Sequence, residues 1–281
     1  MIPVEAVEHR GWAARLELEY ARRNGQSLLT GRRHRGPLRV QKSLYPEGHG
    51  TCHTIIVHPP GGIAEGDRLE LDVSLREDTR VLITTPGATK WYRSTGAGAR
   101  QELRYEIHPG AVLEWLPQES VVFDGARAEM TTSVRLRGNA LYLGWELLCL
   151  GRQAAGERFI RGRVKLKTEV WRDDVRLWSE YALIHGADAL LDSPTGCAGH
   201  AVCATMLLAG LDIEADLLKQ LRQVTVADGI RCGISTLPGV LVSRCLAPFA
   251  EPVRQYFTSL WGLLRPAVSG RQALAPRIWS T

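Results

Sequence analysis

The chain has no long apolar run. Its longest one, residues 201–211, is interrupted by Thr205 and is too short to cross a bilayer as a helix. The N-terminal sequence MIPVEAVEHRGW also lacks the basic region and apolar stretch of a secretory signal. We therefore expect a cytoplasmic protein with no membrane association.

The chain also lacks the short signatures of common enzymes. Its Gly-rich segment 61–67 has neither the lysine nor the hydroxyl residue of a Walker loop, and there is no Gly-x-Ser-x-Gly elbow, HExxH or paired CxxC. Catalytic groups can assemble from distant residues, so a hydrolase or transferase with an unrecognised site stays an alternative. The absences favour a protein that is not an enzyme.

A clustered basic footprint is missing as well. Lys and Arg total 35 against 30 Asp and Glu, and the densest basic stretch is residues 32–35, without interleaved aromatic residues. A short run of this kind is typical of a solvated loop. We expect no nucleic-acid partner.

Cysteines are few and far apart: the chain has 6 of them. A chain of 281 residues folds without staples, so reduced thiols are expected rather than a disulfide framework. Cys197, His200 and Cys203 have a metal-like spacing but no fourth ligand, and buried inert thiols are the commoner reason for such residues. A simple metal-binding protein is a second alternative.

What the sequence does contain is alternation. Apolar residues recur at every second position in many short segments separated by Gly, Pro or Asp, which predicts β-strands. The predicted strands are 12–20, 69–75, 80–84, 112–116, 132–137, 141–150, 163–171 and 175–184.

Helical periodicity appears only late. Apolar stripes predict helices near 213–226 and 251–265, with Pro252 in the first turn of the second and Pro266 at its end. The pattern predicts an open or coiled, mainly β architecture with two helices in the C-terminal region. No linker divides it, so we expect a single domain, β-rich over 1–190 and mixed α/β over 191–281.

Six motifs, in order along the chain, resemble those of the UreD (UreH) family of urease accessory proteins. They are GPLRVQKSLYPE at 36–47, HPPGGIAEGD at 58–67, TTPGATKWYRS at 84–94, LPQE at 116–119, GR-x3-GE at 151–157 and PRIW at 276–279. Each alone has an ordinary reading, since Pro-Pro-Gly-Gly is turn chemistry in any β protein. Together they carry the resemblance, although Trp91 stands where an aliphatic residue is common.

The resemblance implies a fold and a function. The family's fold is a many-stranded, β-helical coil of two sheets with a pair of helices, and its members act as scaffolds rather than enzymes. It implies binding to UreF, through UreF to the GTPase UreG, and to apo-urease, in a hetero-oligomeric complex that delivers nickel. No tightly bound cofactor is expected, and Ni²⁺ would be held transiently.

Carboxylates on apolar strand faces are the candidate nickel ligands. The alternation places Glu114, Glu146 and Glu180 on such faces, where an ionised group must be paired, hydrated or neutralised. Glu47, Asp67 and Glu157 join them because they lie in the family-like motifs. The alternative for all six is structural salt bridges, with arginines such as Arg152 and Arg161. Asp72, whose face carries Glu70 and Ser74, is expected to be ordinary surface.

The two predicted helices are the candidate contact with UreF. Arg254 and Gln255 are expected to be exposed there, so that charge changes at either would weaken the contact. The default alternative is that both apolar stripes pack on the protein's own sheet. Cys197, His200 and Cys203 are expected to be dispensable, because thiolates hold Ni²⁺ more strongly than a transfer site needs.

Overall fold

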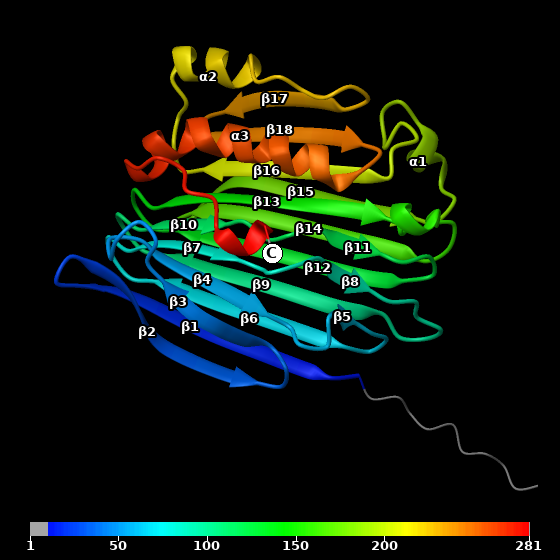
Figure 1. The fold of residues 1–281 in the computed structure, drawn as a ribbon, viewed down its shortest axis with the longest axis horizontal. Helices are drawn as coiled ribbons and strands as arrows, with labels where there is room; N and C mark the ends of the chain where they lie inside the picture. Colours follow the sequence, from blue (N-terminus) through cyan, green and yellow to red (C-terminus); the bar gives the residue numbers. More distant parts are fainter. Residues whose placement is uncertain (1–10, 281) are drawn as a thin grey trace, which may run out of the picture.

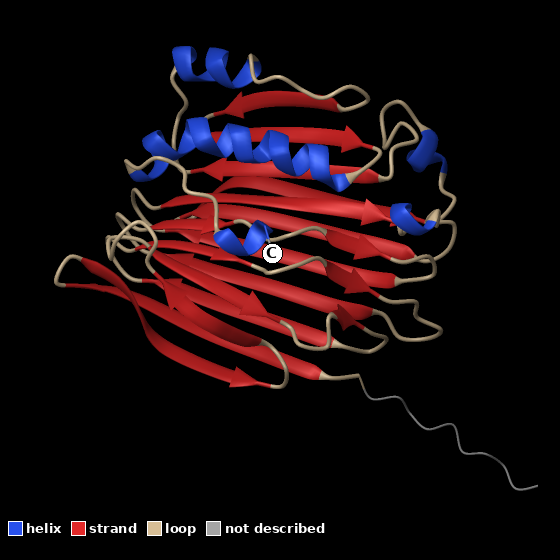
Figure 2. Ribbon diagram, viewed as in Figure 1, coloured by secondary structure: helices blue, strands red, loops and turns tan. Residues whose placement is uncertain are grey.

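The computed structural model describes residues 11–280, which form two large, stacked β-sheets with helices on one side (Figures 1 and 2). The mainly β prediction is confirmed. Residues 1–10, on which the expectation about a secretory signal rests, lie outside the described residues. Within residues 11–280, no helix is long and apolar enough to cross a membrane.

The first sheet, called sheet A below, has seven strands. In spatial order they are β15 (Val175–His185), β14 (Arg163–Arg172), β12 (Arg127–Leu136), β9 (Ala99–Ile107), β6 (Arg68–Leu75), β1 (Ala13–Arg23) and β2 (Gln26–Arg35).

The second sheet, sheet B, follows the order β17 (Arg231–Leu237), β18 (Val240–Ala247), β16 (Val202–Ala209), β13 (Leu141–Leu150), β10 (Val112–Trp115), β7 (Arg80–Thr84), β4 (Cys52–Val57) and β3 (Arg39–Leu44). The short strands β5 (Gly62–Ile63), β8 (Thr89–Trp91) and β11 (Ser120–Val122) extend it at one end.

The chain coils between the two sheets. It passes from β6 through β7 and β8 to β9, then through β10 and β11 to β12, then through β13 to β14, and so returns to sheet A after each visit to sheet B. Strands β1, β6, β9, β12 and β14 therefore pair in parallel. This stack resembles a β-solenoid. Backbone hydrogen bonds hold each turn on the next, so the stack can form without a sequence repeat.

The core has two layers. One fills the space between the sheets, and it includes Leu16, Leu71 and Tyr105 from sheet A. The other lies on the outer face of sheet B, where α3 (Ala250–Ser269) packs its apolar stripe, including Phe257 and Trp261, against β13, β16 and β18. In Figure 1, α3 lies across the front of these strands, and α2 (Ala215–Arg222) lies beside β17. The short α1 (Ala189–Asp192) precedes β16.

Pro266 does not end the second helix. The prediction was wrong by one turn: α3 continues to Ser269, and Gly270, at φ 68°, provides the left-handed cap. Leu264 and Val268 flank the proline and are buried, and Ser269 Oγ donates to the Arg265 carbonyl at 3.1 Å. Tertiary packing thus outweighs the local preference of proline for a helix end.

The expectation of reduced thiols holds only in part. Cys232 and Cys245 are joined as a disulfide between the neighbouring strands β17 and β18, which sequence spacing could not indicate because strand pairing decides which thiols meet. Among the described residues the other four cysteines, Cys52, Cys149, Cys197 and Cys203, are free.

Candidate functional site

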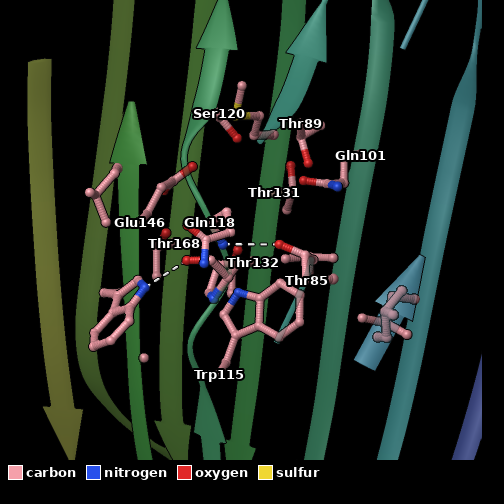
Figure 3. Close-up of a pocket in the computed structure, with 18 of the residues that line it drawn as sticks. Thr85, Thr89, Gln101, Trp115, Gln118, Ser120, Thr131, Thr132, Glu146 and Thr168 are labelled. Carbon is pink, nitrogen blue, oxygen red and sulfur yellow. Dashed lines mark hydrogen bonds between the residues drawn. The ribbon is translucent and has the colours of Figure 1, made fainter. Parts of the chain in front are cut away.

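A cavity of about 130 Å³ lies between the two sheets, and its lining extends from β4 and β6 to β15 and β16 (Figure 3). Its walls combine apolar side chains with hydroxyls, the imidazole of His58 and three glutamates, Glu70, Glu146 and Glu180. Glu70 is also paired with Arg15 and Arg104. The uncharged polar side chains of the lining are Thr85, Thr89, Gln101, Gln118, Ser120, Thr131, Thr132, Thr168 and Thr205.

The register of sheet A creates a polar stripe on its inner face. Paired positions run from Leu16 through Leu71 to Leu103, then change to Thr132, Thr168 and Glu180 on the last three strands. At these paired positions the inner face is therefore apolar on the first strands of the stack and polar on the last three. Threonine fits a strand and still offers a hydroxyl, so the fold tolerates this change.

Sheet B supplies the facing stripe. Glu146 on β13 pairs with Thr205 on β16, which pairs with Arg244 on β18. Gly144, two residues before Glu146, also lines the cavity, and a Cβ there would lie 2.2 Å from the Tyr142 hydroxyl oxygen. The missing side chain keeps this part of the interior open.

Glu146 is the most exceptional group in the cavity. It is partly buried and lines the cavity between the sheets, yet no hydrogen bond or ion pair reaches its carboxyl among residues 11–280. Burial, together with the charge of Glu180, raises the pKa of Glu146 from 4.5 to about 7. A proton on this carboxyl is therefore exchangeable near neutral pH.

Glu180 marks the outer end of the polar stripe. Its side chain is 28% exposed, and its Oε1 accepts a hydrogen bond of 2.7 Å from Arg244 Nη2. The Arg244 guanidinium also lies 5.7 Å from the centre of the Trp178 ring, another cavity residue. This pair joins sheet A to sheet B where the cavity approaches solvent.

Glu47 and Glu114 do not belong to this cavity. Glu114 faces α3 on the outer side of sheet B, where its Oε2 accepts from Trp261 Nε1 at 2.6 Å and from Arg265 Nε at 3.0 Å. Arg265 also donates to Glu47 Oε2 at 2.6 Å, and His53 Nε2 lies 2.5 Å from Glu47 Oε1. The five groups form one buried ion-pair network, named the Arg265 cluster below.

Asp67 and Glu157 hold turns. Asp67 accepts from the backbone N–H groups of Trp12 and Ala64, at 2.7 and 2.8 Å. Glu157 accepts from the Asp124 backbone N–H at 2.7 Å and pairs with Arg152, as the salt-bridge alternative predicted.

Four of the six candidate carboxylates thus have complete structural roles, and only Glu146 and Glu180 share a cavity. Asp72 lies on the outer surface of sheet A, in ion pairs with Arg15 and Arg104, which agrees with its expected role.

Comparison with known proteins decides the family. The sequence profile described as "UreD urease accessory protein" matches residues 13–280. Proteins named urease accessory protein UreD from Dechloromonas aromatica and Pseudomonas aeruginosa are 49% and 52% identical to the chain. The alignments cover 100% and 97% of this chain and 99% and 96% of the relatives. The chain belongs to the UreD family. Its role is in urease maturation, as an accessory protein rather than an enzyme.

In this UreD-family chain, Arg254 is not the freely exposed residue that the helical pattern predicted. Its guanidinium donates to Gln118 Oε1 at 2.7 Å and to Glu119 Oε2 at 3.2 Å, so it fastens α3 to the LPQE segment. Its side chain is 25% exposed, and the preceding residue, Val253, is fully buried. Gln255 is exposed, as predicted.

The CAGHAVC segment brings two thiols together. The Cys197 and Cys203 sulfurs lie 3.3 Å apart, while His200 does not join them as a ligand. Within residues 11–280, no three His, Cys, Asp or Glu side chains form a group that could hold a metal ion.

Sequence reasoning missed the hydroxyls of the cavity and the arginine at its outer end. Thr132 and Thr168 lie within predicted strands, where nothing in the alternation distinguishes them from surface residues, and Thr205 and Arg244 lie on strands that were not predicted. Strand order across two sheets places them together, and that order is a property of the fold rather than of any one segment.

Proposed function

We propose that the chain delivers nickel to apo-urease, in a complex with UreF and the GTPase UreG, and that Ni²⁺ crosses its interior through the cavity between the sheets. The observation that carries the proposal is Glu146, a partly buried carboxyl on the cavity wall without a hydrogen-bond or ion-pair partner among the described residues. Burial of an unsatisfied carboxyl is costly, so a group of this kind at a cavity wall suits a transient cation.

The donor set fits a cargo rather than a resident metal. The carboxylates of Glu146 and Glu180 and a series of threonine hydroxyls offer oxygen ligands, which bind Ni²⁺ less tightly than thiolates do, and His58 is the one imidazole in the described lining. A cation passing between them would exchange water for hydroxyl and carboxylate oxygens at each step. Weak, repeated ligation allows release, whereas a complete shell would trap the metal.

Protonation supplies a way to reset the passage. A carboxyl with a pKa of about 7 binds Ni²⁺ in exchange for its proton, because metal ligands must be deprotonated. When the metal leaves, the proton returns and the interior carries one charge less. We expect nickel transfer to become slower below pH 7, where Glu146 is mostly protonated.

The GTPase activity belongs to a partner in this proposal. The sequence has no phosphate-binding loop, so nucleotide hydrolysis would be performed by UreG and transmitted through UreF. The exposed side of α3 around Gln255 is the proposed UreF contact. Gln255→Arg is expected to reduce co-purification with UreF, while Arg254 is an unsuitable probe because its removal also loosens α3.

The test replaces the cavity carboxylates without changing their size. Glu146→Gln and Glu180→Gln, singly and combined, are co-expressed with the urease subunits and the other accessory proteins. We expect the complex to assemble normally while the nickel content and activity of urease fall, most in the double variant. Asp72→Asn is the matched control, since it removes one carboxylate charge from the outer face of sheet A.

Assembly and delivery are measured separately. Normal nickel content in the double variant would refute the interior route, even if urease maturation still required the chain. Failed assembly of the double variant would assign Glu146 and Glu180 to folding or docking instead. Deletion of the chain, with urease folded but free of nickel, is the reference for complete loss.

A further inference from the structure

A second hollow, of about 440 Å³, lies on the surface where turns leave the coil. Its side chains come from segments far apart in the sequence: Arg93 and Ser94 follow β8, Arg127 begins β12, Arg163 begins β14 and His185 ends β15. Arg161 completes the set, which is named the arginine cleft below. Strands β8 and β11, which lie on the right of Figure 1, border this end of the molecule.

The positive charge of the arginine cleft is only partly neutralised within residues 11–280. Arg161 pairs with Asp124, at 2.6 Å, but Arg93 and Arg127 donate only to the backbone carbonyls of Asp124 and Gly96. The guanidinium of Arg163 makes no ion pair or hydrogen bond within residues 11–280. No carboxylate is among the lining residues. Like charges gathered in one hollow repel one another, so an anion would stabilise them.

A buried hydroxyl lies among these arginines. Ser94 is only 8% exposed, and its Oγ has no hydrogen-bond partner among residues 11–280, although its backbone N–H donates to the Gly125 carbonyl. Buried hydroxyls are nearly always satisfied in native proteins. Because Ser94 lines the cleft, a ligand oxygen there would satisfy it.

The cleft continues into a longer groove. A third hollow shares Arg127 and Arg163 with it and extends across the outer face of sheet A to Tyr181 and Leu183. These two side chains are 59% and 40% exposed and lie on the edge strand β15. The groove's one lining carboxylate, Glu129, is already paired with Arg100 and Lys165.

We propose that the arginine cleft and this groove bind an acidic segment of a protein partner. Its carboxylates occupy the cleft among Arg93, Arg127 and Arg163, and its apolar side chains lie on Tyr181 and Leu183. A carboxylate can accept two parallel N–H bonds from one guanidinium, and the Ser94 hydroxyl donates to a remaining lone pair. A free phosphate would fill the cleft alone and leave the apolar end of the groove unused.

The proposal is independent of the nickel passage and is tested without nickel. The probe is a labelled, acetylated and amidated peptide of alternating Glu and Leu, with a Gln-for-Glu peptide as its control, and fluorescence anisotropy reports binding to the purified full-length chain. The variant Arg93→Gln/Arg163→Gln is compared with Arg32→Gln/Arg33→Gln, which removes the same charge from exposed positions on β2, at the far edge of sheet A. Ser94→Ala removes the hydroxyl alone.

We expect the Glu peptide to bind, the Gln peptide to fail, and Arg93→Gln/Arg163→Gln to weaken binding about tenfold, while Arg32→Gln/Arg33→Gln changes it little. Ser94→Ala should weaken binding about threefold and leave the thermal unfolding midpoint unchanged, because no internal bond is lost.

Four results would overturn the proposal. They are no peptide binding, an equal loss in the Arg32→Gln/Arg33→Gln control, an unaltered affinity in Ser94→Ala, or inorganic phosphate competing as strongly as the peptide. The last result would identify a small-anion site instead.

Discussion

Two pairs of glutamates, one on the outer face of sheet B and one between the two sheets, have opposite environments. Glu47 and Glu114 share Arg265, and their carboxylates also have hydrogen-bond partners in His53 and Trp261. Between the sheets, Glu146 has no such partner within residues 11–280, and Glu180 has one arginine, close to solvent. The two pairs therefore differ in the number of partners as well as in exposure.

The comparison shows how a role can be read from a buried carboxylate. The Arg265 cluster fastens α3 to sheet B, because its members come from the β3–β4 loop, β4, β10 and α3. Its charged groups are paired with one another in doing so. The cavity pair has unused ligand capacity, which is what a cation needs. Structural and functional carboxylates therefore differ in whether their oxygens are left without hydrogen-bond or ion-pair partners.

The largest expected effect comes from breaking the Arg265 cluster. Arg265→Met would leave Glu47 and Glu114 buried without their shared cation, so we expect a loss of about 3–5 kcal/mol in the free energy of unfolding. Chemical denaturation of the purified chain measures it. A loss below that of an ordinary surface change would mean that the cluster is hydrated and does not hold α3.

The cavity carboxyl should respond to pH in the opposite sense from the cluster. Because the pKa of Glu146 is raised from 4.5 to about 7, the folded state holds a proton that the unfolded state releases above pH 4.5. Stability therefore falls as pH rises from about 4.5 to 7, by up to about 3 kcal/mol. Glu146→Gln should flatten this part of the stability profile. An identical profile in the variant would contradict the buried, unpaired state of Glu146.

Glu47 should make stability depend on pH in the opposite direction. Burial alone would raise its pKa, but hydrogen bonds from His53 and Arg265 and the arginine charge lower it from 4.5 to about 2. Its contribution to stability is complete above pH 4.5 and is lost as pH falls toward 2. Glu47→Gln should be less stable than the wild type at neutral pH, and the difference should shrink on acidification. A difference that grows in acid would show that Glu47 is protonated in the fold.

Asp67 represents an intermediate case, a carboxylate satisfied by backbone N–H groups. Asp67→Ala leaves the Trp12 and Ala64 amides without their acceptor, and we expect it to cost about 2 kcal/mol. Thermal unfolding compared with the wild type measures the cost. The folded variant should still deliver nickel. A loss of delivery without a loss of folding would indicate that Asp67 takes part in nickel transfer.

The smallest effect is expected on the outer face of sheet A. Asp72→Asn breaks exposed ion pairs with Arg15 and Arg104, and such pairs contribute about 0–1 kcal/mol. Its stability and its nickel delivery should match those of the wild type within error. A marked loss of either would mean that this face is an interface in the complex.

Local pattern predicted strands well where one face meets the core. The predicted bounds 80–84 and 141–150 coincide with β7 and β13, whereas β12 begins at Arg127, five residues before its predicted start. The apolar run 201–211 contains β16, a strand between β13 and β18 whose two faces are both largely buried. A strand buried on both faces loses the alternation by which strands are recognised.

The cavity was only partly predictable. Alternation placed Glu146 with Leu148 and Leu150, and Glu114 with Val112 and Leu116, and the structure has both sets of neighbours. It did not reveal that these sets lie on opposite faces of sheet B, because alternation separates the two faces of a strand without indicating which face points between the sheets. The pairing partners Trp261 and Arg265 come from more than a hundred residues away.

The most direct test of the interior route is delivery in the presence of a chelator that cannot enter the protein. The assembled complex, loaded with nickel, is mixed with apo-urease and a large excess of chelator, and urease activity is followed over time. The account predicts that activation by the wild-type complex survives the chelator, and that the Glu146→Gln/Glu180→Gln complex loses activation with or without it. Abolition of wild-type activation by the chelator, or full activation by the double variant, would contradict the account.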